Sequence, residues 1–295
     1  MRVFVTGATG FIGSATVQEL LAAGHQVLGL ARSDSGARSL AAAGAEVHRG
    51  DLQDLESLKR GAATSEGVIH AGFVHDFSRF EEVCEIDRRA IEAMGSVLAG
   101  SDRPLIVTSG TGGLTAPGQI ATEDNVPPAN SPLPRVSEQT ALSLLPGVSA
   151  AVVRLPQVHD TVKQGLVSYA IAVAHEKGVS AYIGDGLNRW PAAHVLDVAR
   201  LYRLALEKHE AGAKYHAVGE EGVSVRDIAE VIGRGLKVPV VAISREEAAD
   251  HFGWLAMFAG FDMPASSALT QKRLGWRPSG PGLISDLEQM RYFAA

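Results

Sequence analysis

The sequence predicts an α/β fold in which a doubly wound parallel sheet is followed by a smaller C-terminal lobe. The chain starts with a short apolar strand at residues 2–6, a glycine turn and a helix at residues 11–23. Strands and helices then alternate as far as residue 155, which is the order of a parallel sheet with helices on both faces. Turns and short helices follow residue 155, so we expect a separate lobe there.

The glycine turn organises the first part of the chain. Gly7, Gly10 and Gly13 form G-x-x-G-x-x-G directly between the strand and the helix. Residues without a Cβ let backbone N–H groups approach a pyrophosphate, and the helix N-terminus adds partial positive charge. A turn without a nucleotide is the alternative, and a P-loop is excluded because no Gly-Lys-Ser/Thr follows. The turn therefore predicts a Rossmann-type dinucleotide site.

The end of the second strand, residues 26–30, indicates which dinucleotide is bound. An acidic residue there binds the ribose 2′-OH, whereas an arginine favours a 2′-phosphate. Ala31, Arg32 and Ser33 follow this strand, so we expect NADP(H) rather than NAD(H). The alternative is that Arg32 is a solvated loop charge and Asp34 contacts the ribose.

Two further strand ends are expected to contact the cofactor. Asp51 and Leu52 follow the third strand, residues 45–48, where a carboxylate can accept from the adenine amino group and an apolar side chain can cover the ring. Asp51 could instead cap a helix at residues 52–59. The fourth strand, residues 67–71, ends in the small pair Ala71-Gly72, which lets the middle of the dinucleotide lie against the sheet.

The fifth strand, residues 104–108, leads to the candidate catalytic residues. A helix at residues 76–98 precedes it, and the sequence after it reads Ser109-Gly-Thr111. Hydroxyls at this place would lie beside the nicotinamide and could polarise a substrate oxygen. Turn formation and backbone hydrogen bonding are the alternative roles for both residues.

The rest of the chain completes the expected domain organisation. Residues 117–134 contain five prolines and are predicted to be a loop, a helix starts near Arg135, and the sixth strand at residues 149–155 leads to Pro156-Gln157-Val158-His159. Further elements are expected as helices at 165–177 and 197–208, a strand at 214–218 and a helix from Ser224 to about Lys237. Residues 1–155 are thus the dinucleotide domain, rejoined by residues 192–212, and residues 156–191 and 213–295 are the substrate lobe.

Composition limits the classes of function. The chain has 295 residues, 46% of them hydrophobic and 20% charged, and a net charge of −6, which argues against nucleic acid or an anionic membrane as partner. A single cysteine, Cys84, rules out an intramolecular disulfide and predicts a cytoplasmic protein. We expect no signal peptide or membrane span. The ten histidines form no metal-binding motif, so no metal is expected.

These features together resemble the extended and atypical short-chain dehydrogenases/reductases, which include NAD-dependent epimerase/dehydratase-like and 3β-hydroxysteroid-dehydrogenase-like enzymes. The resemblance covers almost the whole chain. The segments that carry it are Thr6-Gly-Ala-Thr-Gly-Phe-Ile-Gly13, Gly50-Asp51-Leu52, Val68-Ile-His-Ala71, Leu105-Ile-Val-Thr-Ser109, Val153-Arg-Leu-Pro-Gln-Val158 and His194-Val195-x-Asp197.

The resemblance implies roles for individual residues. The pyrophosphate would be held by Thr6, Gly7, Thr9, Gly10, Phe11, Ile12 and Gly13, the 2′-phosphate by Arg32 and Ser33, the adenine by Asp51 and Leu52, the middle of the cofactor by Ala71 and Gly72, and the nicotinamide end by Pro156, Gln157 and Val158. It also implies a homodimer formed through the helices at residues 76–98 and 135–145.

The chain departs from this family at the catalytic tyrosine and lysine, which are spaced Tyr-x-x-x-Lys. One alignment places Pro134 and Glu138 at these two positions, and a second places Arg135 and Gln139 there. Neither provides the pair that protonates the substrate oxygen and lowers the tyrosine pKa.

Three functions are therefore considered. The first is an NADP(H)-linked oxidoreductase acting on a small carbonyl or hydroxyl substrate. Its proton donor would be Ser109 or Thr111, or else a residue of the substrate pocket, for which the candidates are His75, His159, Tyr169 and Tyr182. The second is a non-catalytic NADP-binding sensor or regulatory protein. The third is a nucleotide-sugar epimerase or dehydratase, for which Arg135, Arg154 and Arg189 could bind the diphosphate.

Overall fold

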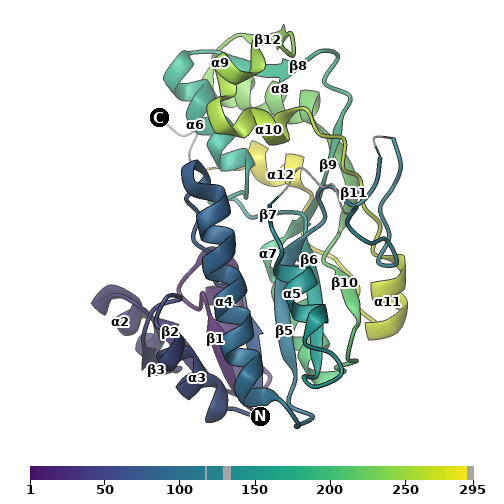
Figure 1. Cartoon of the computed structure of the whole chain (residues 1–295). Helices are drawn as coiled ribbons and strands as arrows, with labels where there is room; N and C mark the ends of the chain where they lie inside the picture. The colour runs from purple at the N-terminus through teal and green to yellow at the C-terminus, as the bar shows by residue number, and fades with distance from the viewer. Residues whose placement is uncertain (117, 129–133, 291–295) are drawn as a thin grey trace.

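The computed structural model describes residues 1–116, 118–128 and 134–290. Its main element is a seven-stranded sheet in which every paired strand is parallel, running through the lower half of Figure 1. In order across the sheet, the strands are β10 (Lys214–His216), β6 (Ala150–Leu155), β5 (Leu105–Gly110), β4 (Gly67–His70), β1 (Arg2–Thr6), β2 (Gln26–Ala31) and β3 (Glu46–Arg49). The predicted doubly wound α/β fold is confirmed.

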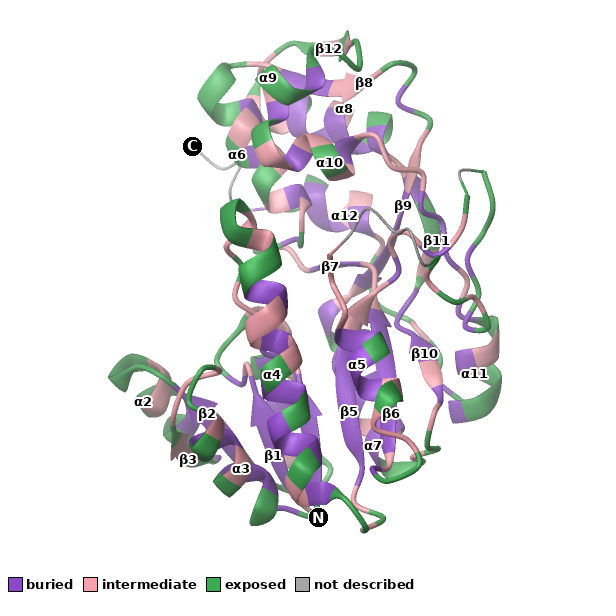
Figure 2. Ribbon diagram, in the orientation of Figure 1, coloured by how far each residue is buried: buried purple, intermediate pink, exposed green. Residues whose placement is uncertain are grey.

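Helices cover both faces of this sheet, as a parallel sheet requires. One apolar core joins the strands to α1 (Phe11–Ala22), α2 (Asp34–Ala42) and α7 (Val195–Glu207). The opposite core joins them to α3 (Leu55–Ala63), α4 (Phe80–Leu98) and α5 (Ser137–Ser143). In Figure 2 the strands β1, β5 and β6 are largely buried, while the outer face of α4 is exposed.

A smaller lobe lies at the carboxyl end of the main sheet (Figure 1). It contains a sheet of β11 (Glu220–Ser224), β9 (Arg189–His194) and β7 (Gln157–His159), and a pair formed by β12 (Val240–Ile243) and β8 (Ser180–Ile183). Its helices are α6 (Val167–Lys177), α8 (Val225–Leu236), α9 (Ala248–Phe252), η2 (Gly253–Leu255), α10 (Ala256–Ala259) and α12 (Leu283–Glu288). The short helix α11 (Ala268–Leu274) packs near β10, and η1 (Phe77–Arg79) precedes α4.

The structure differs from the expected organisation in two places. The strand that adds to the edge of the main sheet is β10, which lies within the range 213–295 that was assigned to the lobe. Residues 192–212, expected to rejoin the dinucleotide domain, contain α7, which packs against α1 in the core of that domain. The strands β7, β8, β9, β11 and β12, which form the two smaller sheets, were not predicted. Part of the predicted loop at 117–134 lies outside the described residues. Among the described helices, none combines the length and apolarity needed to cross a membrane.

Candidate dinucleotide and substrate cleft

A cleft of about 850 Å³ runs across the carboxyl ends of the strands of the main sheet, between this sheet and the lobe. Ligands of open parallel sheets bind at this end, and the volume lies within the range usual for small-molecule sites. The predicted residues that line it are Gly7, Thr9, Gly10, Phe11, Ile12, Gly13, Arg32, Asp51, Leu52, Ala71, Gly72, His75, Ser109, Thr111, Pro156, Gln157, Val158 and Tyr169.

The glycine turn at one wall of the cleft fits a dinucleotide. Gly7 has φ +65°, and a Cβ added there would lie 2.6 Å from the Ala71 carbonyl oxygen. A Cβ at Gly13 would lie 2.0 Å from the Gly7 carbonyl oxygen. Gly10 stands at the N-cap of the twelve-residue helix α1 and has no side chain to cover the first backbone N–H groups. The turn therefore offers unobstructed N–H groups and a helix N-terminus to an anionic pyrophosphate.

The end of β2 places Arg32 at the cleft and Asp34 away from it. The Arg32 side chain is 81% exposed, and its Nε lies 3.9 Å from Asp51 Oδ2. Asp34 does not line the cleft and instead pairs with Arg49 on β3. Ser33, expected at a 2′-phosphate, caps α2 by accepting a hydrogen bond from Gly36 N at 3.1 Å and is not part of the cleft wall.

The alternative role of Asp51 as a helix cap is wrong. The helix that follows starts at Leu55, and Asp54 is its N-cap, with Oδ1 accepting from Ser57 N at 3.0 Å. Asp51 instead lies in the turn before this helix, where its Oδ1 accepts from Gln53 N at 2.9 Å. The carboxylate lines the cleft next to Leu52.

A buried hydrogen-bond chain connects the glycine turn to the start of α5. Gly72 N donates to Thr6 Oγ1 at 3.1 Å, and this oxygen lies 2.7 Å from His70 Nδ1. His70 Nε2 lies 3.0 Å from Asp87 Oδ1, and Asp87 Oδ2 accepts from Ser137 Oγ at 2.5 Å. Burial opposes ionisation of Asp87, but the hydrogen bond from His70 and its other partners outweigh burial and lower the pKa of this carboxyl. Thr6 thus supports the turn from behind and does not line the cleft.

The two candidate hydroxyls after β5 differ in how they are used. Thr111 is buried, and its Oγ1 donates to the Leu155 carbonyl oxygen at 3.3 Å, which is the structural role considered for it. Ser109 is half-buried and lines the cleft. Its hydroxyl has no hydrogen-bond partner in the part of the chain that the structure describes, so Ser109 is the freer of the two to meet a substrate oxygen.

Helix α5 and the residues just before it place Gln139 and Arg135 at the cleft and Glu138 away from it. Arg135 and Gln139 both line the cleft. Glu138 is only 3% exposed and pairs with Arg154 on β6, which is completely buried. Arg135 and Gln139, the pair of the second alignment, thus both line the cleft, whereas Glu138 of the first alignment does not.

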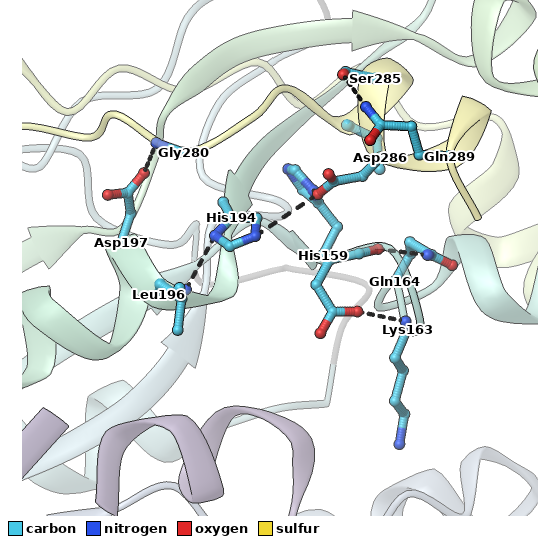
Figure 3. Close-up of polar contacts among 12 residues, drawn as sticks. His159, Lys163, Gln164, His194, Leu196, Asp197, Gly280, Ser285, Asp286 and Gln289 are labelled. Carbon is cyan, nitrogen blue, oxygen red and sulfur yellow. Dashed lines mark hydrogen bonds and ion pairs between the residues drawn. The ribbon is translucent and has the colours of Figure 1, made fainter. Parts of the chain in front are cut away.

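Two residues expected in the substrate pocket lie elsewhere. His159 is buried beneath the cleft wall, with Nδ1 2.7 Å from Asp286 Oδ2, and burial lowers its pKa. Figure 3 shows His159 and His194 directed at Asp286, whereas the Lys163 side chain extends away from this cluster. Tyr182, on β8, packs beneath the Arg226 guanidinium, 5.6 Å from the ring centroid, and does not line the cleft. The sequence around His159 could not reveal its partner, because Asp286 lies 127 residues later in the chain.

The other two pocket candidates do line the cleft, together with residues that the sequence analysis did not select. His75 lies at the cleft surface next to Phe73, and its pKa is lowered by desolvation and by the positive charge of Arg135. Tyr169 is 37% exposed and lies near Phe77.

Among the described residues, no cluster of three or more His, Cys, Asp or Glu side chains could hold a metal ion. Burial raises the pKa of the Cys84 thiol to about 11, in keeping with a packing role.

Comparison with known proteins places this arrangement among dinucleotide enzymes. The sequence model of the NAD dependent epimerase/dehydratase family matches residues 3–132 and 139–219. The chain is 51% identical to the uncharacterized protein C2A9.02 of Schizosaccharomyces pombe, over 99% of this chain and 100% of that protein. It is 25% identical to a UDP-glucose 4-epimerase of Streptomyces lividans, over 97% and 94% of the two chains. A dTDP-glucose 4,6-dehydratase from Streptomyces venezuelae, solved with NAD bound, has the same fold with a TM-score of 0.78 at 20% identity, over 99% and 96% of the chains.

Proposed function

Because the chain belongs to the NAD-dependent epimerase/dehydratase family, we propose that it is an NADP(H)-linked oxidoreductase acting on a small carbonyl or hydroxyl substrate without a tyrosine–lysine pair. The observation that carries this proposal is the single cleft that joins the glycine turn, Arg32 and Ser109. When bound, the nicotinamide cofactor supplies or accepts a hydride. The Ser109 hydroxyl would give a proton to the substrate oxygen, or take one from it, as the hydride moves. Acid–base assistance of this kind contributes about 10²–10⁴-fold.

The preference for NADP(H) rests on the charge at the end of β2. Arg32 is the cleft residue there, and the neighbouring acid Asp34 is neutralised by Arg49 and lies outside the cleft. A guanidinium binds a 2′-phosphate through charge-assisted hydrogen bonds, each of which contributes about 1.5–3 kcal/mol. These contacts would be made by NADPH and not by NADH.

Cofactor titration of the Arg32→Ala variant tests this assignment. We expect the affinity for NADPH to fall about 10–100-fold, the change that corresponds to the loss of one such contact, while the affinity for NADH stays within about twofold. The control is Arg38→Ala, which removes the same charge from the exposed side of α2 without changing the cleft wall. Equal losses for NADPH and NADH would contradict a 2′-phosphate role.

A nucleotide-sugar epimerase is the second candidate, and the UDP-glucose 4-epimerase relative favours it. Of the three arginines that could bind a sugar diphosphate, only Arg135 lines the cleft. Arg154 is buried against Glu138, and Arg189 pairs with Asp262 at 3.0 Å. We therefore rank this function below the oxidoreductase. Tight NADPH binding with no turnover of carbonyl compounds or sugar nucleotides would instead favour the non-catalytic sensor.

A further inference from the structure

Positive charge dominates the wall of the cleft. Asp51 is the one carboxylate among the described lining residues, whereas the lining cations are Arg32, Arg79, Arg135 and Lys163. Arg79 is neutralised by Asp76 and Glu82, both at 3.0 Å. Two more of these cations lie near the part of the cleft proposed for the cofactor. Lys163 Nζ lies 6.0 Å from the ring centroid of Phe11, which belongs to the proposed pyrophosphate turn. Arg32 faces Asp51 at the opposite end of the sheet from β5. Arg135 is therefore the cation left for a substrate.

The Arg135 guanidinium is held in a fixed orientation beside β5. Its Nε donates to Ser137 Oγ at 2.9 Å, and Nη2 donates to the Thr108 carbonyl oxygen at 3.1 Å. The Phe73 ring packs against the guanidinium, with Cζ 4.5 Å from the ring centroid. Arg135 forms no ion pair with any described carboxylate. A guanidinium has five N–H donors in a planar fork, so the Nη1 donors remain available to an oxygen pair such as a carboxylate.

Aromatic rings from two separate segments form the wall next to Arg135. The lining rings are Phe73, His75, Phe77 and Phe80 from the segment after β4, and Tyr169 and Phe258 from the lobe. Trp254 stacks on Phe77 behind this wall, with ring centroids 4.4 Å apart and an interplanar angle of 12°. Flat apolar rings at the wall favour a planar apolar ligand, because offset and edge-to-face aromatic contacts add about 0.5–1.5 kcal/mol to simple burial.

Building on the oxidoreductase function proposed above, we propose that the substrate is an aromatic 2-oxo acid, or the corresponding 2-hydroxy acid. Arg135 binds the carboxylate and the adjacent keto oxygen, and the aromatic wall holds the ring. In the reduction, the keto carbon gains the hydride that the reduced cofactor supplies. The keto oxygen gains a proton from the Ser109 hydroxyl, which water reprotonates, and the product is the 2-hydroxy acid. Arg135 polarises the keto oxygen without giving up a proton, because a guanidinium is not deprotonated in proteins.

Binding of three probes to the NADP⁺-loaded protein tests this inference without turnover, because NADP⁺ and an oxo acid cannot react with each other. The probes are benzoylformate, its neutral methyl ester, and pyruvate, which lacks the ring. Calorimetry should show benzoylformate binding at least about tenfold more tightly than either of the others. A charge-assisted bidentate contact corresponds to about 10–100-fold in affinity.

Variants separate the two parts of the proposed pocket. Arg135→Gln should weaken benzoylformate about 10–100-fold and the ester by a clearly smaller factor, because the ester loses only the contact to its keto oxygen. Phe77→Ala should weaken both ring compounds but not pyruvate. Arg79→Gln, at a cleft arginine whose charge is already paired, is the matched control and should change none of the three affinities.

Two results would overturn the inference. One is an ester that binds as tightly as the acid, and the other is an Arg135→Gln variant that still binds NADPH but weakens all three probes equally. Either would leave the oxidoreductase proposal standing. Failure of the wild-type protein to bind NADP⁺ or NADPH at all would remove the proposed function itself, and the substrate inference with it.

Discussion

The buried ion pair between Glu138 and Arg154 offers the sharpest test of how the cleft is held in place. Arg154 Nε donates to Glu138 Oε2 at 2.7 Å and Nη2 donates to Oε1 at 2.6 Å, and the side chains are 0% and 3% exposed. Replacing Glu138 by Gln keeps the shape but turns an NH₂ group toward the guanidinium and leaves its charge uncompensated. Breaking a buried pair from one side costs about 3–5 kcal/mol, so we expect Glu138→Gln to lower the free energy of unfolding by about 3 kcal/mol.

Urea unfolding followed by circular dichroism measures this loss. The matched control is Glu92→Gln, which removes one partner of the exposed i,i+4 pair with Arg88 and should cost about 0.3–0.5 kcal/mol. The double variant Glu138→Leu/Arg154→Met replaces both charges by apolar groups and should be more stable than Glu138→Gln, since no unpaired charge stays buried. A loss for Glu138→Gln as small as that of the surface control would refute the reasoning.

Two further predictions follow from the turn and the buried histidines. Gly7→Ala should reduce stability and NADPH affinity together, because φ is +65° and the new Cβ would lie 2.6 Å from the Ala71 carbonyl oxygen. Gly24→Ala, with φ +83° and no atom within 4 Å of the added Cβ, should show only the backbone cost of about 1–2 kcal/mol. Burial and Arg154 lower the pKa of His216 to about 4, and burial also lowers that of His159. The unfolded chain therefore takes up more protons below pH 6.5, and His216 should lower stability by up to about 1.4 kcal/mol per pH unit as the pH falls from 6.5 to 5. His159 should add to this loss in the same direction. Urea unfolding at several pH values checks this, and a flat profile in that window would contradict it.

Local sequence signals were sufficient for the parts of the fold that local chemistry determines. The strand, glycine turn and helix at the N-terminus follow from residue order alone. Ser224, where a helix was expected to start, caps α8 by accepting a hydrogen bond from Asp227 N at 3.1 Å. The short strands of the lobe were not predictable in this way. β7, for example, has only three residues and exists because it pairs with β9, more than thirty positions later in the chain.

The position of a candidate site residue was predicted where the backbone alone determines it. The position was missed where a hydrogen-bond partner far away in the sequence determines it. Residues at strand ends such as Asp51 and Ala71 reach the cleft because the parallel sheet brings all carboxyl ends to one edge. By contrast, Ser137 bonds to Asp87, 50 positions earlier, and His159 turns away from the cleft toward α12. No spacing rule along the sequence carries such information.

The register of α5 connects the buried ion pair to the chemistry of the cleft. Successive residues of a helix point about 100° apart, so Glu138 and Gln139 cannot both face the cleft. Arg154 fixes Glu138 on the inner side, and this leaves Gln139 exposed at the cleft and Arg135 just before the helix, with Ser137 Oγ accepting from its Nε. In the oxidoreductase proposed above, Arg135 and Gln139 would orient and polarise the substrate oxygen, but neither a guanidinium nor an amide readily exchanges a proton. That proposed function would then need a separate proton donor, for which Ser109, with its hydroxyl free of other described partners, lies in the same cleft.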